Sequence, residues 1–137
     1  MIIMSVDLGL SRTGLAVSDE SENFAFPKGV ICEKEEQSLI NKICESAAEY
    51  KAKRIVVGLP LNMDGSCGER AETCRAIAKK INEQSGIETE LFDERLTTVS
   101  AHQYLNINDV RGKKRKDTVD TVAATLILED YLRSLKK

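Results

Sequence analysis

The sequence has few aromatic residues, a single histidine and no long hydrophobic run. Its 137 residues include three tyrosines, three phenylalanines and no tryptophan, which argues against an aromatic surface for stacking nucleic-acid bases. No apolar stretch approaches the roughly 18 residues that a membrane-spanning helix needs. The opening Met-Ile-Ile-Met lacks the basic start of a signal peptide. We therefore expect a cytoplasmic protein that does not contact a membrane.

The four cysteines do not form the pattern of a metal site or of a disulfide framework. No Cys-x-x-Cys pair occurs and His102 is the only histidine, so the spacing of zinc ligands is absent. Cys44 and Cys74 fall on the apolar stripes of predicted helices. We expect reduced cysteines that pack as small hydrophobic side chains.

The bulk composition is that of one ordinary globular domain. The chain is 42% hydrophobic and 31% charged, with a net charge of −2, and we expect residues 1–137 to form a single domain. Because the chain has no overall positive charge, any contact with nucleic acid must depend on a local basic patch.

The spacing of hydrophobic residues predicts an α/β fold, because short apolar runs alternate with segments of helical period. Strands are expected at Ile2–Val6, Leu15–Val17, Gly29–Glu33, Arg54–Leu59 and Glu88–Phe92. Helices are expected at Glu35–Tyr50, at Ser66–Gly86, near Thr98–Leu105 and from about Lys116 to Leu135. The second would begin with a capping box of Ser66 and Glu69. The last would follow a basic loop at Asn106–Arg115. This order predicts a mixed five-stranded sheet flanked by helices.

Four acidic residues lie at the ends of these predicted elements. Asp7 ends the first strand, Glu94 follows the fifth, and Asp117 and Asp120 share one face of the last helix. Carboxylates gathered in one site repel each other and need a cation, and ligand sets made only of oxygen favour Mg²⁺ or Mn²⁺. Two such ions can activate a water for phosphodiester cleavage.

Each of these acids also has an ordinary structural explanation. An Asp after a strand is often a turn residue, and an acid in the first turn of a helix often serves the helix dipole. Asp7 has additional support, because the glycine of Asp-x-Gly leaves the backbone open to a phosphate or a metal. For Asp117 the explanation as an N-terminal helix acid is the stronger one.

Several basic residues are candidates for binding a phosphate backbone, and such contacts would make affinity dependent on salt without reading sequence. They are Arg12, Arg70, Arg95, Arg111, Lys113, Lys114, Arg115 and Lys116. The arginines at positions 12, 70 and 95 could instead form structural salt bridges. The cluster at 111–116 could equally be a solvated charge run.

Four sequence blocks, in order along the chain, resemble the YqgF/RuvX family. They are Asp7-Leu-Gly9 with Arg12–Val17, Val57–Ser66, Asp93–Thr98 and Asp120–Leu128. The resemblance implies an RNase H-like fold, with Asp7, Glu94 and Asp120 as the catalytic and metal-binding acids. Asp117 matches no fixed acid of that family, although the related RuvC resolvases have a helical Asp pair at this spacing.

The resemblance implies a metal-dependent hydrolase of phosphodiester bonds, a nuclease that processes the 5′ end of pre-16S rRNA in ribosome biogenesis. Its cofactor would be Mg²⁺ or Mn²⁺, and its partner structured precursor rRNA. Two alternatives stay open: a Holliday junction resolvase acting on branched DNA, and a non-catalytic nucleic-acid-binding module of the same fold. A resolvase is most easily built as a two-fold dimer, and both a monomer and a homodimer are compatible with the sequence.

Overall fold

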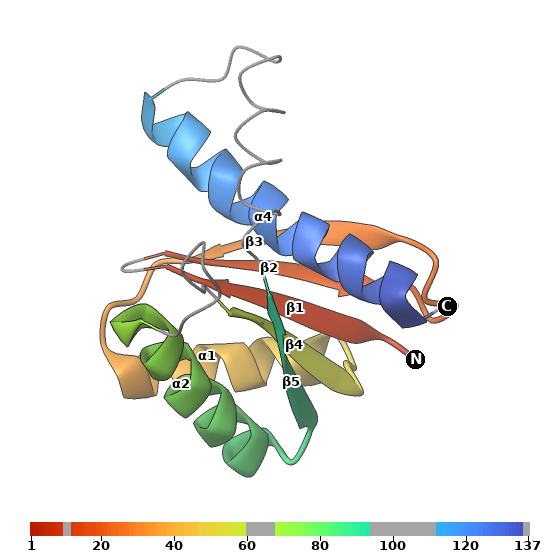
Figure 1. Ribbon diagram of the computed structural model, residues 1–137, viewed down its shortest axis with the longest axis horizontal. Coiled ribbons are helices and arrows are strands. Elements are labelled where there is room, and N and C mark those ends of the chain that lie inside the picture. The colour runs from red at the N-terminus through yellow and green to blue at the C-terminus, as the bar shows by residue number, and fades with distance from the viewer. Residues whose placement is uncertain (10–11, 60–67, 94–111, 136–137) are drawn as a thin grey trace.

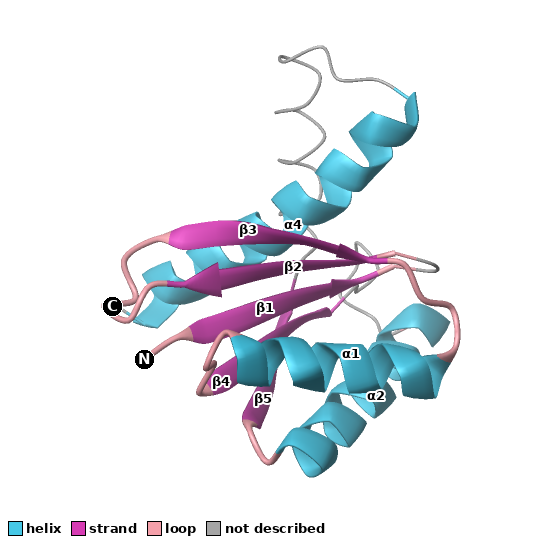
Figure 2. Cartoon of the chain, turned by 180° about the vertical axis from the view of Figure 1, so that it is seen from behind, coloured by secondary structure: helices cyan, strands magenta, loops and turns pink. Residues whose placement is uncertain are grey.

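A mixed sheet of five strands, covered by helices on both faces, forms the described part of the protein (Figures 1 and 2). The computed structural model describes residues 1–9, 12–59, 68–93 and 112–135. In chain order the elements are β1 (Ile3–Leu8), β2 (Thr13–Ser18), β3 (Ala25–Ile31), α1 (Glu36–Glu49), β4 (Arg54–Leu59), α2 (Glu69–Ser85), β5 (Glu88–Asp93) and α4 (Gly112–Leu135). The predicted fold class is therefore confirmed. The short helix predicted near Thr98–Leu105 lies outside the described residues.

The strands lie side by side in the order β3-β2-β1-β4-β5. The pairs β1–β2 and β2–β3 are antiparallel, whereas β4 is parallel to β1 and β5 is parallel to β4. Because β1, β4 and β5 run in one direction, their last residues meet at one end of the sheet. We call this end, marked by Leu8, Leu59 and Asp93, the carboxyl edge.

Four of the five strands have bounds that differ from the sequence prediction, and the differences in β1 and β3 have a physical reason. β1 continues to Leu8, so Asp7 lies within the strand and pairs with Gly14 instead of following the strand. β3 begins at Ala25 and includes Pro27, which we had expected to precede it. Proline is tolerated here because β3 is an edge strand and its pairing with β2 is shifted by a bulge.

The two faces of the sheet bury separate apolar clusters. On one face, α1 and α2 pack on alternate residues of β1, β2 and β4, and the fully buried members include Met4, Val6, Ile40, Ile43, Ile55, Val57 and Ile81. On the other face, α4 packs on the remaining residues, with Ile3, Ala16, Val56, Ala124, Ile127 and Leu128 all fully buried. The sheet is thus the middle of three layers.

Two helices begin at residues other than those predicted. α2 begins at Glu69 with Gly68 as its N-cap and no side-chain cap hydrogen bond, so the expected capping box is wrong; Ser66 lies outside the described residues. α4 begins at Gly112. The basic residues 113–115 therefore lie on a helix rather than in a loop, which is consistent with the high helix propensity of lysine and arginine.

Two of the three cysteines in the described residues pack against the core as predicted, and one does not. None of Cys32, Cys44 and Cys74 forms a disulfide, and Cys32 is exposed. Cys74 is buried in the core beneath α2, and Cys44 packs against the same cluster, where burial raises the pKa of its thiol. None of the described helices combines the length and the apolar character that crossing a bilayer requires.

A polar contact fixes the carboxyl-terminal half of α4 to the sheet. The hydroxyl of Tyr131 accepts a hydrogen bond from Arg54 Nη1 at 2.8 Å and donates one to Glu90. The ring of Phe92 meets the Tyr131 ring edge-on, with 6.0 Å between centroids. Burial, followed by the bond to Glu90, raises the pKa of Tyr131 to about 12.

This raised pKa makes stability depend on alkaline pH. An unfolded tyrosine ionises near pH 10, so the contribution of Tyr131 is fully present below that pH and is lost as pH rises towards 12. We expect wild type to lose about 1.4 kcal/mol more stability than Tyr131→Phe between about pH 9 and about pH 11. Urea unfolding at the two pH values measures the difference. Equal losses in the two proteins would contradict it.

Candidate active site

Asp7 lies near the carboxyl edge, on the face of the sheet that α4 covers. Side chains alternate along a strand, so Asp7 shares a face with Ile3 and Ser5. Ile3 is buried in the cluster beneath α4, and Ser5 Oγ donates a hydrogen bond of 2.6 Å to the carbonyl of Ala124. Asp7 itself is half-buried. Its carboxylate therefore lies where the α4 interface gives way to solvent.

α4 runs over β1 in the opposite direction, and two contacts establish this. Tyr131 bonds to Arg54, which pairs with Ile3 near the start of β1. Ala124, seven residues earlier on the helix, bonds to Ser5 in the middle of the strand. Residues before Ala124 therefore approach the carboxyl edge, and the helix begins beyond it (Figure 1).

This alignment brings the backbone of Asp120 towards Asp7. Asp120 precedes Ala124 by four residues, about 6 Å along a helix. Asp7 follows Ser5 by two residues, about 7 Å along a strand. The two displacements start from one hydrogen bond and both lead towards the carboxyl edge, so the backbone of Asp120 approaches that of Asp7. Asp117 lies on α4 almost one turn further from the sheet. The side chains of both helical acids fall outside the described part.

β5 leads the chain to the same edge. Its last residue, Asp93, pairs with Leu59 at the end of β4, and Phe92 packs beneath α4 against Tyr131. Glu94 is the next residue in the sequence. Glu94 itself lies outside the described residues, as do Arg95 and Arg111.

The turn after Asp7 requires glycine for a steric reason. The Gly9 amide donates a hydrogen bond of 2.8 Å to the carbonyl of Arg12, which closes the turn between β1 and β2. A Cβ added to Gly9 would lie 2.2 Å from that carbonyl oxygen. The glycine of the Asp-x-Gly motif is thus needed because the backbone at position 9 lies close to the carbonyl of Arg12.

We expect Gly9→Ala to cost about 3 kcal/mol of stability, because the clash forces the backbone of the turn to shift. Gly86→Ala is the matched control. Gly86 has a left-handed φ of 71°, but a Cβ added there would meet no atom within 4 Å. Alanine at this position should therefore cost only about 1–2 kcal/mol of stability. Chemical denaturation of both variants measures the two costs. A Gly9→Ala protein as stable as Gly86→Ala would contradict the steric argument.

Two of the predicted phosphate-binding arginines lie at the carboxyl edge. Arg70, in the first turn of α2, donates a hydrogen bond of 2.6 Å from Nη2 to the carbonyl of Leu8. This partner is a backbone oxygen adjacent to Asp7, not the acidic side chain that a structural salt bridge would need. Arg12 follows Gly9 in the turn that joins β1 to β2. Lys113, Lys114, Arg115 and Lys116 lie in the first turns of α4.

Among residues with described side chains, no group of three or more His, Cys, Asp or Glu could hold a metal ion. Of the four predicted acids, only Asp7 has a described side chain. Ser5 is not among the residues predicted from the sequence, although a serine within the apolar run Ile2–Val6 is a signal that could have revealed it. A buried hydroxyl in such a run needs a hydrogen-bond partner from another element.

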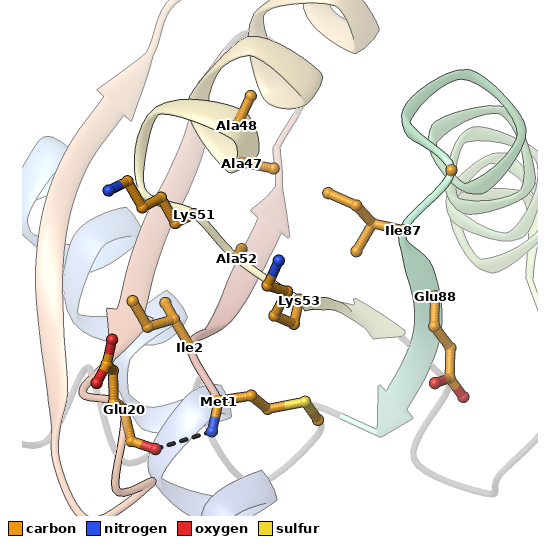
Figure 3. A pocket seen from close by; sticks show the side chains of 11 residues that line it. Met1, Ile2, Glu20, Ala47, Ala48, Lys51, Ala52, Lys53, Ile87 and Glu88 are labelled. Carbon is orange, nitrogen blue, oxygen red and sulfur yellow. Dashed lines mark hydrogen bonds between the residues drawn. The ribbon is translucent and has the colours of Figure 1, made fainter.

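A hollow of about 850 Å³ lies at the opposite end of the sheet, where the parallel strands begin (Figure 3). Ile2, Lys53 and Glu88 line it together with the ends of α1 and α2, and the amino group of Met1 bonds to the carbonyl of Glu20 at 2.8 Å. None of the predicted site residues with described side chains, Asp7, Arg12 and Arg70, lines this hollow. It is separate from the carboxyl edge.

Solved structures with the same fold include resolvases bound to branched DNA. The chain is similar to Thermus thermophilus RuvC in complex with a Holliday junction substrate, with a TM-score of 0.60, 13% identity and coverage of 98% of this chain and 96% of that chain. It is similar to the Fowlpox virus resolvase in complex with Holliday junction DNA, with a TM-score of 0.59, 15% identity and complete coverage of both chains. The predicted RNase H-like fold is thereby confirmed.

Relatives of the same length have higher identity. A Bacillus cytotoxicus protein named "Putative pre-16S rRNA nuclease" is 40% identical over 136 residues, which are 98% of this chain and 99% of the relative. A Clostridium beijerinckii protein of the same name is 39% identical over 137 residues, 100% of this chain and 99% of the relative. Residues 1–134 match the family described as "RuvX: Holliday junction resolvase". The chain therefore belongs to the RuvX (YqgF) family.

Proposed function

We propose that this protein is a metal-dependent nuclease that processes the 5′ end of pre-16S rRNA in the cytoplasm, with Asp7, Glu94 and Asp120 as its catalytic carboxylates. The observation that carries the proposal is the alignment of α4 on β1. Asp120 precedes Ala124, the hydrogen-bond partner of Ser5, by about one helical turn, so its backbone approaches that of Asp7. β5 ends at Asp93, so the residue before Glu94 belongs to the same edge.

The proposed donor set consists only of carboxylate oxygens, which suits Mg²⁺ or Mn²⁺. Asp7, Glu94 and Asp120 would hold the metal, with Asp117 as a candidate fourth ligand. The bound metal would supply a water nucleophile and stabilise the charge on the leaving oxygen. Asp7 suits this role because it belongs to a buried strand that holds its backbone in place, while Asp7 itself is only half-buried.

Basic residues around the edge would hold the phosphate backbone against the acids. Arg70 and Arg12 flank the end of β1, and the guanidinium of Arg70 has five N–H donors, one of which bonds to Leu8. Lys113–Lys116 precede Asp120 on α4, and Arg95 and Arg111 are further candidates from the sequence. Such contacts position a strand without reading its sequence, so we expect binding to weaken steeply with added salt.

Cleavage of branched DNA is the second candidate function. The family description names a Holliday junction resolvase, and two neighbours in fold are solved with Holliday junctions. Carboxylate-metal chemistry attacks RNA and DNA phosphodiesters alike, so the substrate rather than the chemistry distinguishes the two functions.

The test compares precursor rRNA with a four-way DNA junction as substrates of the purified protein, with added Mn²⁺ and with a chelator. We expect Mn²⁺-dependent removal of the 5′ extension of the rRNA and an intact junction. Paired cuts in the junction with an untouched rRNA would support the resolvase instead.

The same assay tests whether the protein is catalytic at all. We expect Asp120→Asn and Glu94→Gln each to abolish cleavage while the protein stays folded. Asp130→Asn is the control for Asp120, because Asp130 lies on the same helix near its other end, in an exposed pair with Arg133. Asp130→Asn should cleave as wild type does. Undiminished function in Asp120→Asn and Glu94→Gln would favour a non-catalytic binding module.

A further inference from the structure

Ser5 places a hydroxyl in the middle of the apolar layer between β1 and α4. It is fully buried, as are its neighbours in that layer, Ile3, Val56, Ala124 and Ile127. Its Oγ donates to the carbonyl of Ala124 at 2.6 Å, a contact between residues 119 positions apart in the sequence. Ala124 and the neighbouring Ala16 are small, which lets the helix lie close enough to the sheet for the bond to form.

Apolar packing alone would fix the position of α4 on the sheet only loosely. Hydrophobic burial has no preferred direction, and a helix that slides by one residue moves about 1.5 Å and turns by about 100°. A hydrogen bond requires its own donor and acceptor within a few tenths of an ångström. Ligands of a metal must likewise be placed to within about 0.2 Å. The packing between α4 and the sheet therefore needs a directional contact close to the site.

We propose that Ser5 is a positioning residue for the metal site. Its hydrogen bond to Ala124 sets how far along β1 the helix lies, and thereby the separation of Asp7 and Asp120. The proposal rests on the proposed function of those two acids. Ser5 is two residues from Asp7 and its partner is one turn from Asp120, whereas Tyr131, which also bonds α4 to the sheet, is eleven residues from Asp120.

The test measures Mn²⁺ binding by calorimetry in Ser5→Ala and in a matched control, Ser18→Ala. Ser18 is a second buried hydroxyl of the same sheet. Its Oγ accepts a hydrogen bond of 2.8 Å from the Ile3 amide and donates one of 3.0 Å to the carbonyl of Asp19. Each variant loses one buried hydroxyl, so both should lose similar stability, but Ser18 lies on β2 away from the carboxyl edge.

We expect Ser5→Ala to bind Mn²⁺ about ten-fold or more weakly than wild type, since removing a residue that orients metal ligands typically costs 10–100-fold in affinity. Ser18→Ala should bind as wild type does. Ser5→Cys keeps a weak donor of similar size and should bind with intermediate affinity, which provides a second measurement if Ser5→Ala does not fold. Cleavage should need correspondingly more Mn²⁺ in both Ser5 variants.

Two results would overturn the proposal. If the Ser5 variants bind Mn²⁺ as wild type does, or if Ser18→Ala weakens binding equally, Ser5 has no special role at the metal site. In both cases wild type still binds Mn²⁺ and cleaves, so the proposed function survives. Failure of wild type itself to bind Mn²⁺ and to cleave would instead overturn the proposed function, and the role of Ser5 with it.

Discussion

Asp7→Asn is expected to lower the rate of metal-dependent cleavage by about a thousand-fold or more. The carboxylate supplies negative charge to the metal, and the metal stabilises charge in the transition state by several kcal/mol. A loss of about 4 kcal/mol corresponds to about three orders of magnitude in rate. Single-turnover cleavage of precursor rRNA at saturating Mn²⁺ measures the change.

Metal-induced stabilisation provides an independent measurement on the same variant. A ligand that binds only the folded state stabilises wild type by about 2.7 kcal/mol at a concentration of 100 times its Kd. Asp7→Asn should lose most of this gain, although asparagine is close to aspartate in size and should keep the strand intact. Asp130→Asn, the control used for Asp120, should keep the gain. If Asp7→Asn retained both cleavage and Mn²⁺ stabilisation, Asp7 would not be a metal ligand.

Ile127→Ala is expected to cost about 3–4 kcal/mol of stability, a large share of the 5–15 kcal/mol that a domain of this kind has. Ile127 is fully buried between α4 and the sheet. Ile43→Ala is its matched control, since Ile43 is also fully buried but lies on α1, across the sheet. The two variants remove the same atoms from equally buried sites, so we expect similar losses in chemical denaturation.

The two variants should nevertheless differ in their need for metal. The cavity left by Ile127→Ala loosens α4, the helix that carries Asp120. The cavity left by Ile43→Ala loosens α1, on the other face of the sheet. We expect Ile127→Ala to require more Mn²⁺ for half-maximal cleavage and Ile43→Ala to require the same amount as wild type. Titration of cleavage against Mn²⁺, at a temperature where both variants are folded, measures this requirement. An equal shift in both variants would mean that global stability, not the placement of α4, controls the site.

The elements predicted best from the sequence are those whose ends have a local chemical signal. β4 was predicted at both ends, Arg54 and Leu59, because a β-branched run stops before Pro60. The ends of β1 and β3 were wrong because strand pairing decides them. Asp7 pairs with Gly14 despite its charge, and Pro27 fits an edge strand that hydrophobic pattern alone does not reveal.

For the candidate site, sequence reasoning identified residue types better than their surroundings. It placed Asp7 at the end of the first strand, but that strand continues to Leu8, and it placed Arg70 near the start of a helix, where the structure has it. It gave no sign of what bonds to Ser5 or where α4 lies on β1. That contact joins residues 119 positions apart, and neither periodicity nor local motifs carry information over such a separation.

The bulge in β3 also limits how two copies of this chain could assemble. Leu15 pairs with Gly29 and Ala16 with Pro27, so Lys28 is an extra residue without a partner on β2. A strand from another molecule that added to this edge would meet a proline without an amide proton and a broken ladder. The sheet cannot readily be extended across β3. If symmetric cutting requires a two-fold pair, its shared surface has to be sought elsewhere.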